Sequence, residues 1–111
     1  MTDTAAARDT AAERIRQNAK WGEQNHPDGT GPDVRPLLFA GALPRADDLA
    51  RYATQATDAH AADGTVTWLD ILREEYHEAL AESDPAKLRE ELIQLAAVAQ
   101  QWVEHIDRRE A

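Results

Sequence analysis

The architecture follows from residues 67–106, which read TWLDILREEYHEALAESDPAKLREELIQLAAVAQQWVEHI. Both halves of this stretch place apolar side chains at the three- and four-residue spacing of an amphipathic helix. The expected stripe of the first half comprises Leu69, Leu72, Tyr76 and Leu80, and that of the second half comprises Leu88, Leu92, Leu95, Ala99, Trp102 and Ile106. Because few residues separate the halves, the stretch predicts two helices packed antiparallel as a hairpin.

Signals at the ends of these two helices support this interpretation. Thr67 and Asp70 are three residues apart, and they resemble a capping box in which Asp replaces the usual Glu. We therefore expect the first helix to begin at Thr67 and to continue to about Glu82. Residues 83–85 read SDP, an N-cap acceptor followed by proline, which is typical of a new helix.

The chain before residue 67 predicts two further helices around an irregular segment. Four of the five prolines and three of the five glycines fall between positions 27 and 44, so residues 26–45 are expected to form a Pro/Gly-rich loop. A helix is expected over residues 10–25, with Asp9 or Thr10 as its N-cap. Another is expected over residues 46–62, ended by the glycine that follows.

Composition supports an all-α fold. Alanine, glutamate, leucine and arginine are abundant, whereas aromatic and β-branched residues are scarce, which favours helix over strand. A chain of 111 residues is expected to form one domain. We therefore predict a single all-α domain over residues 1–111, a small bundle of about four helices whose antiparallel hairpin carries the acidic residues. The chain has no cysteine, which excludes disulfides and thiolate metal sites.

The charge of the chain bears on its partners. Its 12 basic and 21 acidic side chains give a net charge of −9. This charge argues against a nucleic-acid polymer or an anionic membrane surface, because both are bound through clustered Lys and Arg. The amino terminus lacks a targeting signal, and the longest apolar run, residues 37–43, is too short to span a bilayer. We expect a cytoplasmic protein, in which a divalent cation would be needed to bind a phosphate-bearing ligand.

Oxygen-bearing side chains recur three residues apart on the predicted hairpin. Glu75 and Glu78 form one pair, and Glu91 and Gln94 form the other. Residues at this spacing project from the same helical face, and antiparallel packing can bring the two pairs face to face. Such a group of oxygens suits Mg²⁺. The spacing equally fits ordinary solvated glutamates that pair with neighbouring Arg and Lys side chains.

The acidic segment resembles the EExxE…ExxD signature of the MazG-like all-α nucleoside triphosphate pyrophosphohydrolases, a superfamily that includes dimeric dUTPases and dCTP pyrophosphatases. Residues 74–78 read EEYHE, and residues 91–94 read ELIQ. Upstream, residues 20–27 read KWGEQNHP, which is similar to the W-x-x-Q-x-H segment on the first helix of that family. One position departs from the signature, because Gln94 stands where the family has Asp. A glutamine carbonyl can bind Mg²⁺ but adds no negative charge.

The resemblance implies a Mg²⁺-dependent hydrolase, with Mn²⁺ as the alternative ion, that converts a ribo- or deoxyribonucleoside triphosphate to the monophosphate and pyrophosphate. The metal would lower the pKa of a bound water, and a free carboxylate such as Glu74 would take its proton. The residues implied to be catalytic are Glu74, Glu75, Glu78 and Glu91. The implied metal ligands are Glu75, Glu78, Glu91 and Gln94. The implied substrate-binding residues are Trp21, Gln24, His26 and Gln94.

Other interpretations of these residues stay open. Trp21 also fits a core or interface position, and Gln24 and His26 suit the end of a helix that runs into a loop. Because Gln94 carries no charge, the alternative function is a catalytically weakened module that binds nucleotide or a protein partner. A third hypothesis is a helical partner-binding subunit unrelated to nucleotides. The family and the long stripe of the last helix also predict a homodimer or homotetramer.

Overall fold

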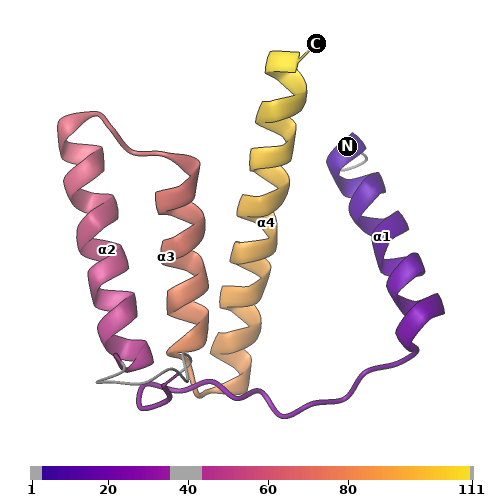
Figure 1. Cartoon of the computed structure of the whole chain (residues 1–111), viewed down its shortest axis with the longest axis horizontal. Helices are drawn as coiled ribbons and strands as arrows, with labels where there is room; N and C mark the ends of the chain where they lie inside the picture. Colours follow the sequence, from indigo (N-terminus) through magenta and orange to yellow (C-terminus); the bar gives the residue numbers. More distant parts are fainter. Residues whose placement is uncertain (1–3, 36–43, 111) are drawn as a thin grey trace. The chain divides into compact units, whose positions relative to one another are not determined.

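A computed structural model describes residues 4–35 and 44–110 of the chain. The described residues form helices and no strand, which confirms the predicted all-α class (Figure 1). The helices are α1 (Ala5–Trp21), α2 (Ala46–Asp63), α3 (Trp68–Leu80) and α4 (Pro85–Glu110). Within the predicted irregular segment, residues 26–35 and 44–45 form no helix. The apolar run 37–43 lies outside the described residues. None of the helices described is long and apolar enough to cross a membrane.

The chain divides into two compact units, and each is described by itself. Unit 1 comprises Met1–Asp28 and Ala99–Ala111, and unit 2 comprises Gly29–Val98. Unit 1 therefore contains α1 and the C-terminal part of α4. Unit 2 contains α2, α3 and the N-terminal part of α4, and it includes the whole predicted acidic segment.

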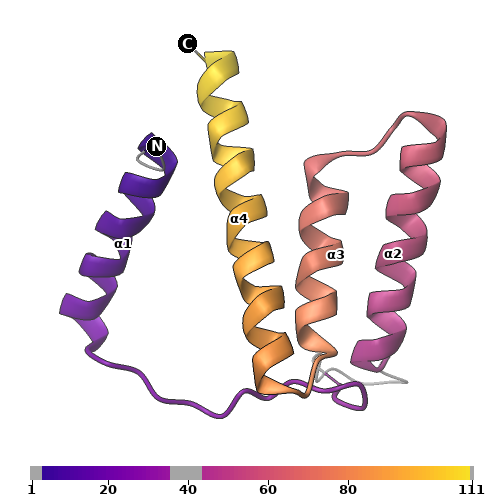
Figure 2. The same cartoon turned by 180° about the vertical axis from the view of Figure 1, so that it is seen from behind.

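Unit 2 is a layer of three helices. Helix α3 lies between α2 and the N-terminal part of α4, and views from opposite sides agree on this order (Figure 1, Figure 2). Four apolar residues of this unit are buried, and most of them are small: Ala46, Ala53, Ala79 and Leu88. Small side chains at helix contacts allow the helix axes to approach closely, which suits packing within one layer.

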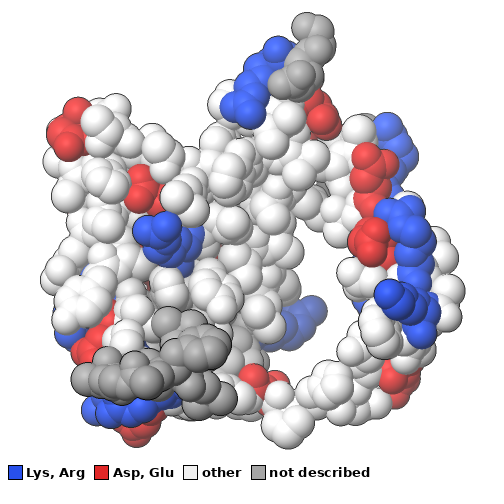
Figure 3. Space-filling view, in the orientation of Figure 1, with Lys and Arg blue, Asp and Glu red and all other residues white. Residues whose placement is uncertain are grey.

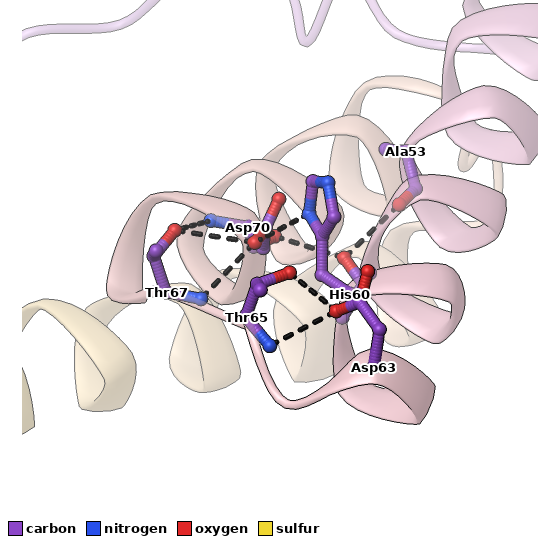
Figure 4. Close-up of polar contacts among 7 residues, drawn as sticks. Ala53, His60, Asp63, Thr65, Thr67 and Asp70 are labelled. Atoms are coloured by element: carbon purple, nitrogen blue, oxygen red, sulfur yellow. Dashed lines mark hydrogen bonds and ion pairs between the residues drawn. The ribbon is translucent and has the colours of Figure 1, made fainter.

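Helix α3 begins with the predicted capping box. The Asp70 backbone N–H donates to Thr67 Oγ1 over 3.3 Å, and the Thr67 N–H donates to Asp70 Oδ2 over 3.0 Å. His60, in the last turn of α2, places its Nδ1 2.9 Å from the same Asp70 oxygen (Figure 4). Thr57 Oγ1 adds a hydrogen bond to the backbone oxygen of Asp70 over 3.2 Å. These contacts fix the start of α3 against α2.

Helix α4 also begins where the sequence predicts. Its first residue is Pro85, and the Lys87 N–H donates to Asp84 Oδ2 over 3.0 Å. Helix α3 ends at Leu80, two residues before the predicted end, because the Glu82 N–H bonds to Ala79 O, three residues back, and no longer follows the α-helical pattern. Residues 81–84 are the whole connection between α3 and α4, so the predicted tight hairpin is confirmed.

Residues 30–34, before α2, form hydrogen bonds with other segments at one end of unit 2. The Gly31 N–H donates to Leu80 O over 2.9 Å, and Thr30 Oγ1 donates to Glu82 O over 2.6 Å. The first bond satisfies a carbonyl group at the C-terminus of α3 that has no partner within the helix, and the second satisfies a carbonyl group of the connection that follows. Gly31 is buried with a φ of 146°, a conformation that favours glycine. The Ala46 N–H donates to Val34 O over 2.8 Å and anchors the start of α2.

The predicted bounds of the first helix are wrong. Helix α1 begins at Ala5, where Thr4 Oγ1 accepts from the Ala7 N–H over 3.1 Å, so neither Asp9 nor Thr10 is the N-cap. Alanine is the strongest helix former, and the alanines after Thr4 extend the helix toward the amino terminus. The helix ends at Trp21 because Gly22 adopts a φ of 70° and its N–H closes on an α1 carbonyl.

The predicted apolar stripe of α3 is only partly covered, since Leu72 and Leu80 are half-buried and the other two members are exposed. Leu69 is 51% exposed and Tyr76 is 47% exposed, whereas the buried residues of α3 are Asp70 and Ala79. Asp70 and Ala79 lie about 180° apart around the helix, taking about 100° per residue. They are buried because α3 packs against α2 on one side and α4 on the other. Leu69 and Tyr76 lie between these two contacts, which leaves about half of each side chain exposed.

Candidate metal centre

Three glutamates of unit 2 bring their carboxylates together. Glu75 and Glu78 come from adjacent turns of α3, and Glu91 comes from the second turn of α4. One oxygen of each lies within 4.8 Å of an oxygen of each of the others. The four-residue connection 81–84 forces the two helices to run antiparallel, which places Glu91 opposite the α3 pair. We call these three residues the carboxylate cluster.

Two oxygens of the carboxylate cluster lack a donor. All three glutamates are half-buried. Glu75 Oε2 and Glu91 Oε2 are both shielded from solvent and have no hydrogen-bond partner among the described residues. A buried carboxylate oxygen without a donor is unfavourable, and a cation is the partner that satisfies several such oxygens at once. The donor set therefore fits a hard divalent cation.

The electrostatics of the cluster reflect this lack of donors. Burial raises the pKa of Glu78 to about 7, and the charges of Glu75 and Glu91, a hydrogen bond with Glu91 and the charge of Glu74 add to the effect. Burial also raises the pKa of Glu75, with contributions from Glu91 and Glu74. Near neutral pH the ion-free cluster therefore retains a proton that is shared among like charges.

Two further residues of α3 have polar groups whose burial bears on this site to different degrees. Glu74 is half-buried, and its charge raises the pKa values of Glu75 and Glu78, which places it close to both. His77 has a buried Nδ1 without a hydrogen-bond partner, and burial together with the charge of Arg73 lowers its pKa. Its ring centroid lies 5.1 Å from that of the neighbouring tyrosine. Spacing gave no signal for this buried ring nitrogen, because position 77 falls between the motif residues.

Gln94 differs in burial from the other implied ligands. It lies on α4 three residues after Glu91 and is exposed, whereas the carboxylate cluster is half-buried. Among the described His, Cys, Asp and Glu side chains, Glu75, Glu78 and Glu91 form the group that could hold a metal. The role of Gln94 as a ligand stays a prediction.

Three of the four implied substrate-binding residues, Trp21, Gln24 and His26, belong to unit 1, whereas Gln94 belongs to unit 2. Trp21 ends α1 with 62% of its surface exposed, and Lys20 Nζ lies 4.8 Å from the centroid of its ring. An exposed ring is not a core residue of unit 1. Gln24 helps to line a polar cavity of about 500 Å³, together with Arg14, Asn18, Gly22 and Glu23. The exposed side chain of His26 places Nε2 3.2 Å from Gln24 Oε1.

Comparison with protein-family models, with curated proteins and with solved structures found no match to the chain. The residues and geometry of the carboxylate cluster therefore carry the functional inference. Its position on a short helical hairpin, with two donorless buried oxygens, is the feature that requires an explanation.

Proposed function

We propose that the chain is a Mg²⁺-dependent nucleoside triphosphate pyrophosphohydrolase, with Mn²⁺ as the alternative ion. The observation that carries this proposal is the carboxylate cluster, in which three glutamate oxygens converge and two buried oxygens lack donors. The substrate class is supported by the resemblance of residues 74–78 and 91–94 to the MazG-like signature. The products would be a nucleoside monophosphate and pyrophosphate.

The spacing of the cluster suits the proposed ion. Mg²⁺ binds oxygen ligands octahedrally at about 2.0–2.1 Å, which puts neighbouring ligand oxygens about 3 Å apart. Oxygens that already lie within 4.8 Å of one another can reach that spacing through small rotations of the side chains. Glu75, Glu78 and Glu91 would hold the ion. When bound, it would neutralise charge on the triphosphate and activate water for attack on phosphorus.

The chain's own residues would manage the protons of the reaction. Glu78 holds a proton near pH 7 in the ion-free protein and releases it when a cation replaces that proton. Glu74 lies beside the cluster and is the carboxylate left to take a proton from the attacking water. As water adds to phosphorus, the bond from phosphorus to the bridging oxygen of pyrophosphate breaks, and pyrophosphate leaves with those bonding electrons.

Base recognition is proposed for Trp21, Gln24 and His26. The exposed Trp21 ring offers a face for stacking, and base stacking on an aromatic ring is favourable for every base. Gln24 and His26 offer hydrogen-bond donors and acceptors to a base or sugar. A nucleotide substrate also fits the proposed cytoplasmic location and excludes neither a dimer nor a tetramer.

Pyrophosphate release tests the proposed activity. The protein is incubated with canonical and modified NTPs and dNTPs in the presence of Mg²⁺ or Mn²⁺, and free pyrophosphate is measured. We expect release from at least one substrate and none in the presence of EDTA. No release from any substrate, together with no binding of Mg²⁺ by calorimetry, would overturn the proposal.

A second candidate function is supported by Gln94. This side chain is uncharged and exposed, so it adds no fourth charge to the half-buried carboxylates. The alternative is therefore a catalytically weakened module that binds metal and nucleotide, or a protein partner, without turnover. Binding of Mg²⁺ and a nucleotide in calorimetry without release of pyrophosphate would favour this alternative over the enzyme.

A further inference from the structure

Unit 1 contains a polar cavity at the C-terminal end of α1, which we call the α1 cavity. Its volume is about 500 Å³, within the range of roughly 300–1,000 Å³ that is usual for small-molecule sites. The residues that line it are Arg14 and Asn18 on α1, Gly22 at the end of that helix, and Glu23 and Gln24 after it. All of them are exposed, so the cavity is open to solvent and a ligand can enter it.

The end of α1 shapes this cavity. Taking about 100° per residue, Arg14, Asn18 and Gly22 lie within about 80° of one another around the helix. Gly22 adopts a φ of 70°, a conformation that favours glycine, and the helix ends there. This turn brings the polar side chains of the two residues that follow beside those of the helix.

The α1 cavity holds a cation and an anion that do not pair. Arg14 and Glu23 both line it, yet among the residues described they form no ion pair with each other. By contrast, Glu13 and Arg16 on the same helix are 2.6 Å apart. Because the two charges of the cavity cancel at a distance, it offers little net attraction to a phosphate group. It suits a neutral ligand that has both hydrogen-bond donors and acceptors on its edge.

Two neighbouring side chains orient the polar groups that follow α1. Asn25 Nδ2 donates to Glu23 Oε2 over 3.1 Å, which holds that carboxylate. His26 Nε2 lies 3.2 Å from Gln24 Oε1 and donates to it in the tautomer with a proton on Nε2. With its oxygen engaged, Gln24 presents its NH₂ group as a donor. Glu23 is therefore the acceptor of the cavity, and Gln24 and Arg14 are its donors.

The helix beside the cavity is suited to a charged nucleotide, although the chain as a whole is acidic. Figure 3 shows Lys and Arg side chains along α1. The helix carries Arg8, Arg14, Arg16 and Lys20 against Asp9 and Glu13. A positive segment in a chain of net charge −9 attracts an anionic ligand locally. The neutral part of such a ligand, its base, is what the α1 cavity can hold.

Among the common bases, guanine matches the donors and acceptor of this cavity. A carboxylate only accepts hydrogen bonds, and guanine offers two adjacent donors, N1–H and the N2 amine. Adenine and cytosine place an acceptor beside their amine, and uracil and thymine flank their one donor with carbonyl groups. Arginine is also the most frequent partner of the guanine O6 and N7 acceptors. We propose that the α1 cavity selects guanine, with Glu23 accepting from N1–H and N2 and Arg14 donating to O6 and N7.

This inference rests on the proposed function, since it names the base of the triphosphate substrate, and Trp21 completes it. Lys20 Nζ lies 4.8 Å from the centroid of the Trp21 ring and covers one of its faces. Around α1, Trp21 lies between Lys20 and Asn18, so the cavity is on the side away from Lys20. A base whose edge enters the cavity stacks on the face that Lys20 leaves open. Stacking accepts any base, and the polar groups of the cavity make the choice.

Mononucleotides test the cavity apart from metal and turnover. GMP, IMP, AMP, CMP and UMP are titrated in EDTA, and NMR follows the indole N–H signal of Trp21, which is identified by its loss in Trp21→Phe. We expect GMP to bind at least about tenfold more tightly than AMP, CMP or UMP. IMP lacks the N2 amine but keeps N1–H, O6 and N7, so its affinity should be intermediate. Equal binding of the five nucleotides, or no shift of the Trp21 signal with GMP, would overturn the proposal.

Two substitutions separate the assigned contacts. Glu23→Gln should weaken GMP by about tenfold and IMP by less, because only GMP has the N2 amine. Arg14→Gln should weaken GMP and IMP equally, because both nucleotides have O6 and N7. Glu13→Gln, the control on α1, should leave both affinities unchanged. A preference for GMP over IMP that survives in Glu23→Gln would contradict the role of Glu23.

Pyrophosphate release then distinguishes failure of this inference from failure of the proposed function. With Mg²⁺ present, kcat/KM for GTP should exceed the values for ATP, CTP and UTP at least about tenfold. If GMP is preferred in EDTA but no triphosphate is hydrolysed, the proposed function fails and the guanine site stands. If the triphosphates are hydrolysed without preference among the bases, the guanine site fails and the proposed function stands.

Discussion

Helix α3 carries a buried carboxylate on one side and half-buried carboxylates on another, and their pKa values are shifted in opposite directions. Burial penalises the charged form of Asp70, but hydrogen bonds from Thr67 and His60 outweigh that penalty and hold its pKa below the usual value. On the side toward α4, burial and like charges raise the pKa values of Glu75 and Glu78. Similar residues on one helix thus differ because donors surround one and not the others.

This difference separates a structural carboxylate from candidate functional ones. The capping box and His60 supply hydrogen-bond donors to Asp70, so its carboxylate needs no ligand (Figure 4). In the carboxylate cluster, two buried oxygens have no hydrogen-bond partner among the described residues. An acidic residue near a helix contact is therefore no sign of a metal site by itself. The absence of donors on the protein side is the informative observation.

The largest effect is expected from removing one charge of the cluster. Glu75→Gln or Glu91→Gln keeps the shape of the side chain but weakens its interaction with a cation, so pyrophosphate release should fall at least about 100-fold. Binding of Mg²⁺ by calorimetry should weaken in parallel. The matched control is Glu13→Gln, an exposed α1 glutamate paired with Arg16, which should leave turnover unchanged. Near-normal turnover of both cluster variants would mean that other carboxylates hold the ion.

A second effect concerns stability and pH in the ion-free protein. The pKa of Glu78 in the folded chain is about 7, above the ordinary value of 4.5, so its protonated form stabilises the fold. This contribution is complete below about pH 4.5 and is lost as the pH rises through 7. The free energy of unfolding of the natural chain should fall by about 1 kcal/mol over this pH range, after allowance for solvent screening. This fall should be absent in Glu78→Gln, because glutamine does not titrate.

Thermal unfolding in EDTA at pH 5 and pH 8, followed by circular dichroism, measures this contribution. From pH 5 to pH 8, the Tm of the natural chain should decrease by more than the Tm of Glu78→Gln. Addition of Mg²⁺ at pH 8 should raise the Tm of the natural chain, because the ion binds the folded state. Parallel pH profiles for the two proteins would show that the cluster holds no shared proton.

A substitution on the side of α3 that contacts α2 should change the stability of the protein and leave its activity unchanged. Thr67→Ala removes the side-chain oxygen that caps α3, and loss of such a cap costs about 1 kcal/mol in the free energy of unfolding. Pyrophosphate release by the folded protein should not change. Thr54→Ala, the same substitution within α2, should not lower stability. Lost activity with unchanged stability in Thr67→Ala would mean that this side also serves the reaction.

Several parts of the fold were predictable from local signals. The capping box at Thr67, the proline at Pro85 and the glycine after α2 each specify a helix end through short-range hydrogen bonds or fixed dihedrals. The proximity of Glu75, Glu78 and Glu91 followed from their spacing and from the short connection. These features depend on neighbours in sequence, which is why the sequence reveals them.

Other features depend on contacts between distant residues. Periodicity placed Leu69 and Tyr76 in one apolar stripe of α3, but periodicity does not say which part of a stripe is covered, and these two side chains are about half exposed. The contact of His60 with Asp70 joins two helices and has no local signature. The start of α1 was predicted wrongly because Thr4, Asp9 and Thr10 are all residues that can cap a helix. The alanines after Thr4 favour the longer helix.

The smallest change in metal affinity is expected from a substitution at Gln94, three residues after Glu91, that adds a negative charge rather than removing one. Gln94→Asp introduces the residue that the MazG-like signature has at this position, and it should raise Mg²⁺ affinity by about three- to tenfold, less than a buried charge would, because the side chain is exposed. Gln101→Asp adds the same charge to an exposed position further along α4 and should have no such effect. Calorimetric titration with Mg²⁺ at pH 8 compares the two variants. If both raise the affinity equally, the gain comes from net charge alone, and Gln94 is not a ligand position.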